Sequence, residues 1–210
     1  MLSADSLPSN LPQLLALAGA LGWASGVRLY LVLFLTGMAG TLGWIPLPGG
    51  LQILMHPALL IGSGFMLFVE FFADKIPGLD TVWDMIHSVI RIPAGAALAA
   101  GVFGADSTTM GLVAALLGGT LAATSYATKV TTRAAVNTSP EPFSNIGVSL
   151  LEDGAVMGAM WLATKHPVIF FFALAATLAF SLWLIVVLFK YLRALFRRFT
   201  TWNLPAGWLR

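Results

Sequence analysis

The chain has 210 residues, of which 58% are hydrophobic and 10% are charged, and its formal net charge is +2. A soluble domain averages about 25% charged residues, so this composition predicts an integral membrane protein and excludes an ordinary soluble enzyme. The small net charge gives no indication of nucleic-acid binding. The absence of cysteine excludes disulfides, thiolate metal sites and cysteine nucleophiles.

Long apolar runs favour transmembrane helices over the alternating ten-residue pattern of a β-barrel. We therefore predict an all-α polytopic helical bundle. Its six spans are expected at about 13–40, 57–73, 82–104, 110–128, 146–164 and 167–189. Turns rich in proline and glycine separate several of them, as in Ile45-Pro46-Leu47-Pro48-Gly49-Gly50. Residues 1–190 then form a single transmembrane domain, and residues 191–210 form a basic cytoplasmic tail.

Lysine and arginine gather on one side of this predicted bundle, in the connections 75–91 and 129–133 and in the tail. The opposite side receives only Lys165. Under the positive-inside rule, this bias predicts that both termini are cytoplasmic. Three spans in each half would make the halves oppositely oriented, as in inverted-repeat transporters. Because matches between glycine- and alanine-rich segments arise easily by chance, unrelated halves remain the alternative to an inverted 3+3 repeat.

Arg28 lies near the middle of the first predicted span, which is otherwise apolar from Leu14 to Gly40. An arginine at the centre of a membrane helix costs about 2.5–3.5 kcal/mol on insertion scales, so we expect it to face the bundle interior. It then binds an anion or pairs with a carboxylate. The alternatives are a purely structural pair with Glu70 or Asp74, or snorkelling from a tilted helix. Small residues at helical spacing precede it and predict close helix packing: Gly19, Gly22 and Gly26.

The third predicted span opens with a polar stripe. Its members, which fall within about 60° of one another on a helix, are Asp80, Asp84, His87 and Arg91. The apolar stretch 92–105 alone reaches about 21 Å, short of a ~30 Å hydrocarbon core, so the span draws part of the stripe towards the membrane. Ionisable groups at that depth indicate a functional site. For Asp84 the alternative is a capping box with Thr81.

Glu70 and Asp74 lie four residues apart just before this stripe and share a helix face. Carboxylates with one imidazole suit a divalent cation such as Mg²⁺, Mn²⁺ or Zn²⁺, as ligand or as substrate. The same groups could relay protons, because histidine titrates near neutral pH. The candidate metal ligands are Glu70, Asp74, Asp80, Asp84 and His87. No other cofactor is expected.

The second half of the chain carries a looser version of the same pattern. Lys129 and Arg133 are four residues apart at the end of the fourth predicted span, so they share a face. Glu152 and Asp153 are neighbours about seven residues inside the fifth span, too deep to be solvated. We interpret all four as part of an ion or substrate pathway, and a structural pairing of the acids with Lys129 or Arg133 is the alternative.

A set of short motifs in the first half resembles a family of small bacterial integral membrane proteins described as a domain of unknown function. The motifs are Gly26-Val27-Arg28-Leu29-Tyr30, Val69-Glu70, Ala73-Asp74-Lys75-Ile76-Pro77-Gly78-Leu79-Asp80, Trp83-Asp84, His87, Arg91 and Pro93-Ala94-Gly95-Ala96. The resemblance covers about residues 15–190. It implies a location in the bacterial cytoplasmic (inner) membrane and no mechanism.

The sequence has no nucleotide-binding P-loop, no zinc-protease motif and no nucleophile elbow, so no enzyme class is predicted. The leading hypothesis is a small carrier or channel-like protein that binds a cation or couples to protons, with Arg28 and Arg91 as counter-charges. A first alternative is a binder or translocator of an anionic lipid or phosphate headgroup, through Arg28, Arg91, Lys129 and Arg133. A second is a non-transporting scaffold or partner subunit. The expected partners are the lipid bilayer and an ion or small polar substrate, and a homodimer fits a chain of this size.

Overall fold

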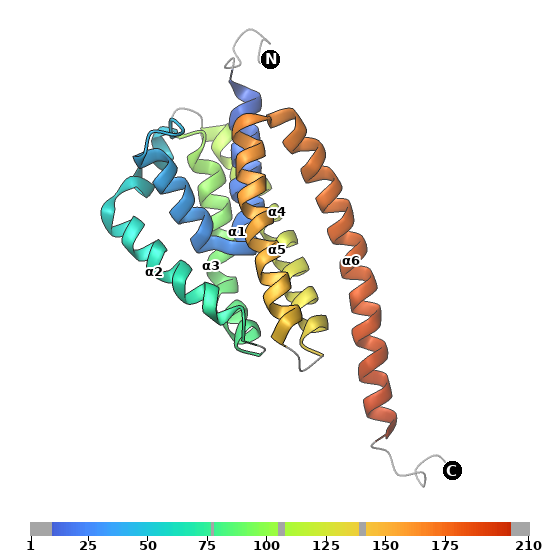
Figure 1. Cartoon of the computed structure of the whole chain (residues 1–210). Coiled ribbons are helices and arrows are strands. Elements are labelled where there is room, and N and C mark those ends of the chain that lie inside the picture. Colours follow the sequence, from blue (N-terminus) through green and yellow to red (C-terminus); the bar gives the residue numbers. More distant parts are fainter. Residues whose placement is uncertain (1–9, 77, 105–107, 139–141, 203–210) are drawn as a thin grey trace.

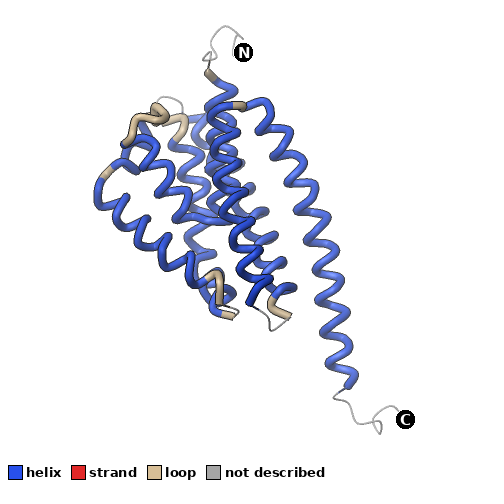
Figure 2. Tube along the Cα trace, viewed as in Figure 1, coloured by secondary structure: helices blue, strands red, loops and turns tan. Residues whose placement is uncertain are grey.

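The computed structural model describes residues 10–76, 78–104, 108–138 and 142–202, and every regular element in these ranges is a helix. The elements are α1 (Leu11–Thr41), the 3-10 helix η2 (Gly49–Met55), α2 (Pro57–Ala73), α3 (Leu79–Gly101), α4 (Thr108–Val136), α5 (Pro142–Lys165) and α6 (Pro167–Trp202). Loops are short connections at the two ends of the bundle (Figure 2). The prediction of an all-α polytopic membrane protein is confirmed.

Helix α1 is broken at Arg28, where φ is −144° and ψ is 78°. The outer ends of its two limbs, 11–27 and 29–41, lie at the same end of the bundle (Figure 1). Leu15 of the first limb lines a cavity with Phe171 at the start of α6, and Ala39 of the second limb lines another with Lys165 at the end of α5. Helix α1 therefore enters the bundle, turns at Arg28 and returns. The prediction of one continuous crossing at 13–40 is wrong.

Helices α2 to α6 follow in alternating directions, so that Leu11 and Trp202 lie at opposite ends of the bundle (Figure 1). The expectation that both ends of the chain lie on one side counted α1 as a full crossing, and this arrangement of the described helices does not support it. By length and hydropathy, α4, α5 and α6 are each able to span a membrane, and α1 meets the same criteria only when its two limbs are counted as one helix; η2 with α2, bent by 70°, makes a fifth candidate. A count of six crossings is not confirmed. Neither is the inverted repeat, since α4 carries no break like that of α1.

The remaining predicted spans agree with helices of the structure. Helix α2 occupies the predicted range of 57–73, α4 and α5 cover the spans at 110–128 and 146–164, and α3 ends at Gly101, three residues before the end of the span predicted at 82–104. Helix α6 continues past residue 189 to Trp202, so the first part of the predicted basic tail is helical. Large apolar side chains cover the outward faces of α2, α4 and α6, as lipid contact requires; Phe65, Leu116 and Phe172 are examples.

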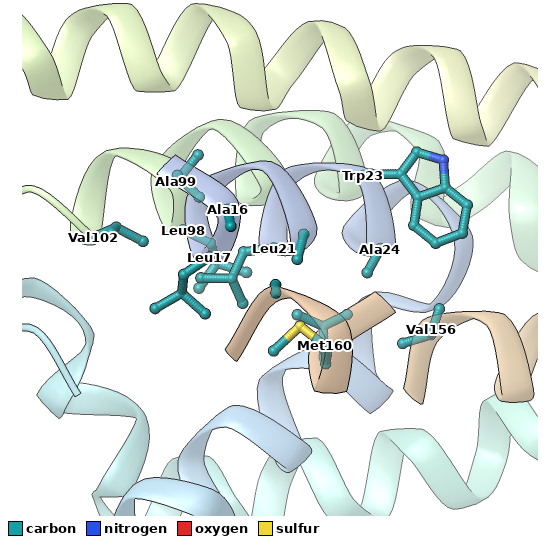
Figure 3. Close-up of a cluster of buried hydrophobic side chains, with 14 of the residues drawn as sticks. Ala16, Leu17, Leu21, Trp23, Ala24, Leu98, Ala99, Val102, Val156 and Met160 are labelled. Atoms are coloured by element: carbon teal, nitrogen blue, oxygen red, sulfur yellow. The ribbon is translucent and has the colours of Figure 1, made fainter. Parts of the chain in front are cut away.

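The apolar core surrounds the first limb of α1. Figure 3 shows Leu17 and Leu21 of this limb near Leu98 of α3 and near Val156 and Met160 of α5. Nearly all residues of this limb from Ala16 onwards are buried, which shows that the limb lies at the centre of the bundle. Its buried end therefore carries Arg28 into the interior of the protein.

Small residues of this limb allow close helix packing, as their spacing predicts. A Cβ atom at Gly22 would lie 2.6 Å from the Cα of Gly118 on α4, and one at Gly26 would overlap the backbone of α4. Gly19 faces the ring of Phe170 on α6 instead, at 3.3 Å from the added atom. These contacts bring the break of α1 next to the charged part of α4.

Candidate functional site

Arg28 is fully buried at the break of α1 and is surrounded by partners from α2 and α5. One terminal nitrogen pairs with Asp74, directly after the end of α2. Its Nε lies 3.0 Å from Asp153 and 3.6 Å from Glu152. The other terminal nitrogen donates to the hydroxyl and the carbonyl oxygen of Ser149, at 2.6 and 3.1 Å. Arg28 thus faces the interior and meets carboxylates, as both the functional interpretation and the structural pair with Asp74 expected, and the snorkelling alternative is excluded.

Arg91 of α3 is the second fully buried guanidinium. Its Nη2 donates to Glu70 at 2.7 Å, and its Nη1 pairs with Asp84 at 2.8 Å. Nη1 also approaches the backbone carbonyl of Val27, the last residue before the break of α1, at 3.5 Å. Because a helix end leaves carbonyl groups without intrahelical donors, a cation at this position stabilises the broken helix.

Lys129 of α4 connects the groups around Arg28 with those around Arg91. Its Nζ lies 3.2 Å from Asp74, 3.1 Å from Asp84 and 3.8 Å from Glu152. It also donates to the carbonyl oxygen of Val27 at 3.2 Å. Two cations thus converge on the carbonyl that the break of α1 sets free, which explains why the chain tolerates a non-helical turn inside the bundle.

Arg133 lies one helical turn further along α4 and binds Glu152 of α5 through two nitrogen atoms. Its Nη2 and Nε donate to the two carboxylate oxygens of Glu152 at 2.8 and 3.3 Å. Its Nη1 donates to the carbonyl of Asp74 at 2.8 Å and to the side chain of Asn145 at 3.2 Å, and lies 3.8 Å from Asp80. A guanidinium with several acceptors in a fork arrangement holds three helices in one geometry.

Asp80 closes the network beside the first turn of α3. It accepts hydrogen bonds from the backbone amides of Gly78 and Thr81 at 2.9 and 2.7 Å, and from Asn137 at 3.0 Å. Asp80 is therefore the carboxylate that accepts hydrogen bonds from backbone amides at the start of α3. The capping-box alternative for Asp84 is wrong, because Asp84 pairs with Arg91 and with a lysine of α4 instead.

These side chains form a single ion-pair network that contains more carboxylates than cations. It comprises six of the nine acidic residues of the chain and four of the eleven Lys and Arg residues. The acids are Glu70, Asp74, Asp80, Asp84, Glu152 and Asp153, and the cations are Arg28, Arg91, Lys129 and Arg133. The only members with side chains more than a tenth exposed are Glu152 and Asp153, at 12% and 17%.

His87 belongs to the polar stripe by sequence but stays outside the ion-pair network. Its ring stacks on Trp83 at a centroid distance of 4.0 Å, and its Nδ1 lies 2.8 Å from the carbonyl oxygen of the same residue. Within the described ranges, no three His, Cys, Asp or Glu side chains converge in a way that would hold a metal ion. The divalent-cation site expected from Glu70, Asp74, Asp80, Asp84 and His87 therefore gains no support from this arrangement and stays a prediction. Its carboxylates face guanidinium and ammonium groups rather than one common point.

Three polar residues of the site were missed by sequence reasoning: Asn137, Asn145 and Ser149. Asn145 and Ser149 precede Glu152 at helical spacing, so that all three share one face of α5. This spacing could have identified Asn145 and Ser149 as members of the site from the sequence. Asn137 lies beyond the end of α4, and only the tertiary structure brings it to Asp80.

Comparison with known protein families finds one match. The family described as Domain of unknown function (DUF4126) matches residues 15–187, a range that contains the whole ion-pair network. No curated protein and no solved structure matches the chain. The resemblance inferred from the motifs is thus confirmed for a domain-of-unknown-function family.

Proposed function

The chain belongs to the DUF4126 family, whose description assigns no activity, and we propose that it is a small membrane carrier that binds a cation, or protons, at the ion-pair network. The observation that carries the proposal is the break of α1 at Arg28, inside a buried network that has two more carboxylates than cations. Broken helices at membrane depth are typical of the substrate and ion sites of secondary transporters.

Unpaired carboxylate oxygens support a cation or proton as the ligand. Glu70 Oε2, Asp74 Oδ1 and Asp84 Oδ2 are buried and have no hydrogen-bond partner among the described residues. A buried acceptor without a donor is costly, and a proton or a cation would supply the missing partner. Each proton or monovalent cation would also offset one of the two surplus negative charges of the network.

The network is also suited to exchange of partners. Glu152 Oε2 lies 2.8 Å from Arg133, 3.6 Å from Arg28 and 3.8 Å from Lys129, so it can change partner without a large displacement. A carrier needs such a bistable element, whose two arrangements differ little in energy. These alternative pairs distinguish the network from one fixed structural salt bridge.

An anionic headgroup is a weaker candidate for the same site. Each of the four cations already has at least two anionic or carbonyl partners, and an added anion would increase a local excess of negative charge. A non-transporting scaffold remains the main competing function, since buried ion pairs also specify helix packing.

We propose that the end of the bundle with Lys75, Lys190 and Arg193 faces the cytoplasm of a bacterium, since Lys165 is the only lysine or arginine described at the other end. Leu11 then lies towards the outer side of the inner membrane. The network lies nearer the cytoplasmic ends of α2 and α4, where Asp74 and Arg133 are located.

Charge movement across vesicle membranes tests the carrier. Proteoliposomes adsorbed on a solid-supported membrane receive concentration jumps of protons, Na⁺, K⁺ or tetraethylammonium. We expect a transient current with at least one of them, its loss in Asp153→Asn and its retention in Asp153→Glu. Folded protein that gives no current beyond that of protein-free vesicles would contradict the proposal and favour the scaffold.

A further inference from the structure

A groove opens between α2 and α5, with the second limb of α1 as its floor. Its volume is about 360 Å³, and its lining includes Leu31 of α1, Gly64, Phe68 and Phe71 of α2, and Asp153 and Met157 of α5. Asp153 is the only ionisable residue of this lining. It is also the most exposed carboxylate of the ion-pair network, so the groove borders that network at Asp153.

A second cavity continues along α5 from this groove towards the outer end of the bundle. It has a volume of about 490 Å³ and shares Met157 with the groove. Trp44, Trp161 and Met160 contribute to its wall, together with Thr36, whose buried hydroxyl has no hydrogen-bond partner among the described residues. From Asp153 to the last residue of α5 the helix rises about 18 Å, which is room for an elongated ligand.

The walls and the charge of the groove suit one class of molecule. Aromatic faces attract organic cations, and methionine adapts to ligands of different shape. The carboxylate of Asp153 adds an ionic contact, and the carboxylate surplus of the network makes a positive ligand favourable. A fatty acid or a neutral acyl chain would instead leave this carboxylate facing a like charge or hydrocarbon.

The chain itself places an ammonium group at the rim of this groove. The Nζ of Lys75 lies 2.9 Å from the centroid of the Phe71 ring and donates to the carbonyl oxygen of Phe71. Burial, followed by the charge of Arg28, lowers the pKa of Lys75 below the usual lysine range. The contact shows that a cation fits against an aromatic ring at this position.

We propose that the groove binds a hydrophobic organic cation, with its positive group between Asp153 and the rings of Phe68 and Phe71, where it displaces the ammonium group of Lys75, and its apolar part along Met157. This inference rests on the proposed carrier function and names its substrate class. Arg28 does not lose all its partners when Asp153 binds the ligand, because its ion pair with Asp74 and its hydrogen bonds to Ser149 remain.

Two ions of nearly identical size and opposite charge test this inference. Equilibrium binding of tetraphenylphosphonium and of tetraphenylborate is measured on the full-length protein in a non-ionic detergent. We expect saturable binding of tetraphenylphosphonium at one site per chain, at least tenfold weaker binding of tetraphenylborate, and at least tenfold weaker phosphonium binding in Asp153→Asn. Asp153→Glu should restore binding, and Lys190→Gln, far from the groove, should leave it unchanged.

A second variant keeps the test independent of the charge at Asp153. Met157→Trp adds bulk where the two cavities meet and should also weaken phosphonium binding at least tenfold, while the thermal unfolding midpoint without ligand shows that the variant is folded. Equal affinity for both ions, no saturable binding, or undiminished binding in Asp153→Asn would overturn the proposal. Phosphonium binding that depends on Asp153, without any current in proteoliposomes, would refute the carrier function and support the binding site in the groove. A current without phosphonium binding would support the carrier function and refute the binding site.

Discussion

Replacement of Arg91 by methionine is the sharpest test of the ion-pair network as a structural element. Arg91 is fully buried and is, among the described residues, the only cation paired with Glu70, which is buried as completely. Asp84, the second partner of Arg91, keeps its contact with Lys129 at 3.1 Å. Methionine retains much of the side-chain length, so the substitution removes the charge and leaves a single carboxylate, Glu70, without a partner.

The expected loss in the free energy of unfolding follows from the unpaired carboxylate of Glu70. Breaking a buried ion pair by removing one partner destabilises a protein by about 3–5 kcal/mol, because the other charge stays buried. This corresponds to a change of about 150- to 5,000-fold in the folding equilibrium. Glu70→Gln in the same chain removes the unpaired charge, so we expect the double variant to recover most of the loss. A double variant that is less destabilised than the sum of the two single variants indicates a direct interaction between the two side chains.

Unfolding in mixed micelles with increasing mole fraction of dodecyl sulfate gives the measurement. The seven tryptophans of the chain provide a fluorescence signal. Arg91→Met, Glu70→Gln and the double variant are compared with the parent protein. A loss of less than about 1 kcal/mol in Arg91→Met, or a double variant as unstable as the sum of the two single ones, would refute the reasoning.

Further predictions concern packing and topology. Gly26→Ala should destabilise the protein by about 1–3 kcal/mol in the same assay, because its Cβ would overlap the backbone of α4. Gly154→Ala has no atom within 4 Å of the added group and should leave stability nearly unchanged. Because the chain has no cysteine, single cysteines report topology cleanly. Cysteines at Asn10 and Gly43 should react with an impermeant maleimide from one side of the membrane, and a cysteine at Thr138 from the other; labelling of the first two from opposite sides would contradict the hairpin of α1.

The sequence was sufficient for much of the candidate site, because burial of a charge in a membrane protein requires partners. Helical spacing grouped Glu70 with Asp74, and Lys129 with Arg133, and each of these residues lies in the network. The same spacing also included His87, which packs on Trp83 instead. Periodicity identifies a shared helix face, but it does not identify which atoms on that face meet a partner.

The membrane location, the helical class and the approximate positions of α2 to α5 depend on local composition, and the sequence alone determined them. The break of α1 was decided by tertiary structure. An apolar run of this length is compatible with one straight span, and the non-helical turn at Arg28 is stable only because Arg91 and Lys129 from two other helices meet the carbonyl of Val27. Tertiary structure likewise decided the partners of the carboxylates, because it placed a guanidinium group beside Glu70, Asp74, Asp80 and Asp84.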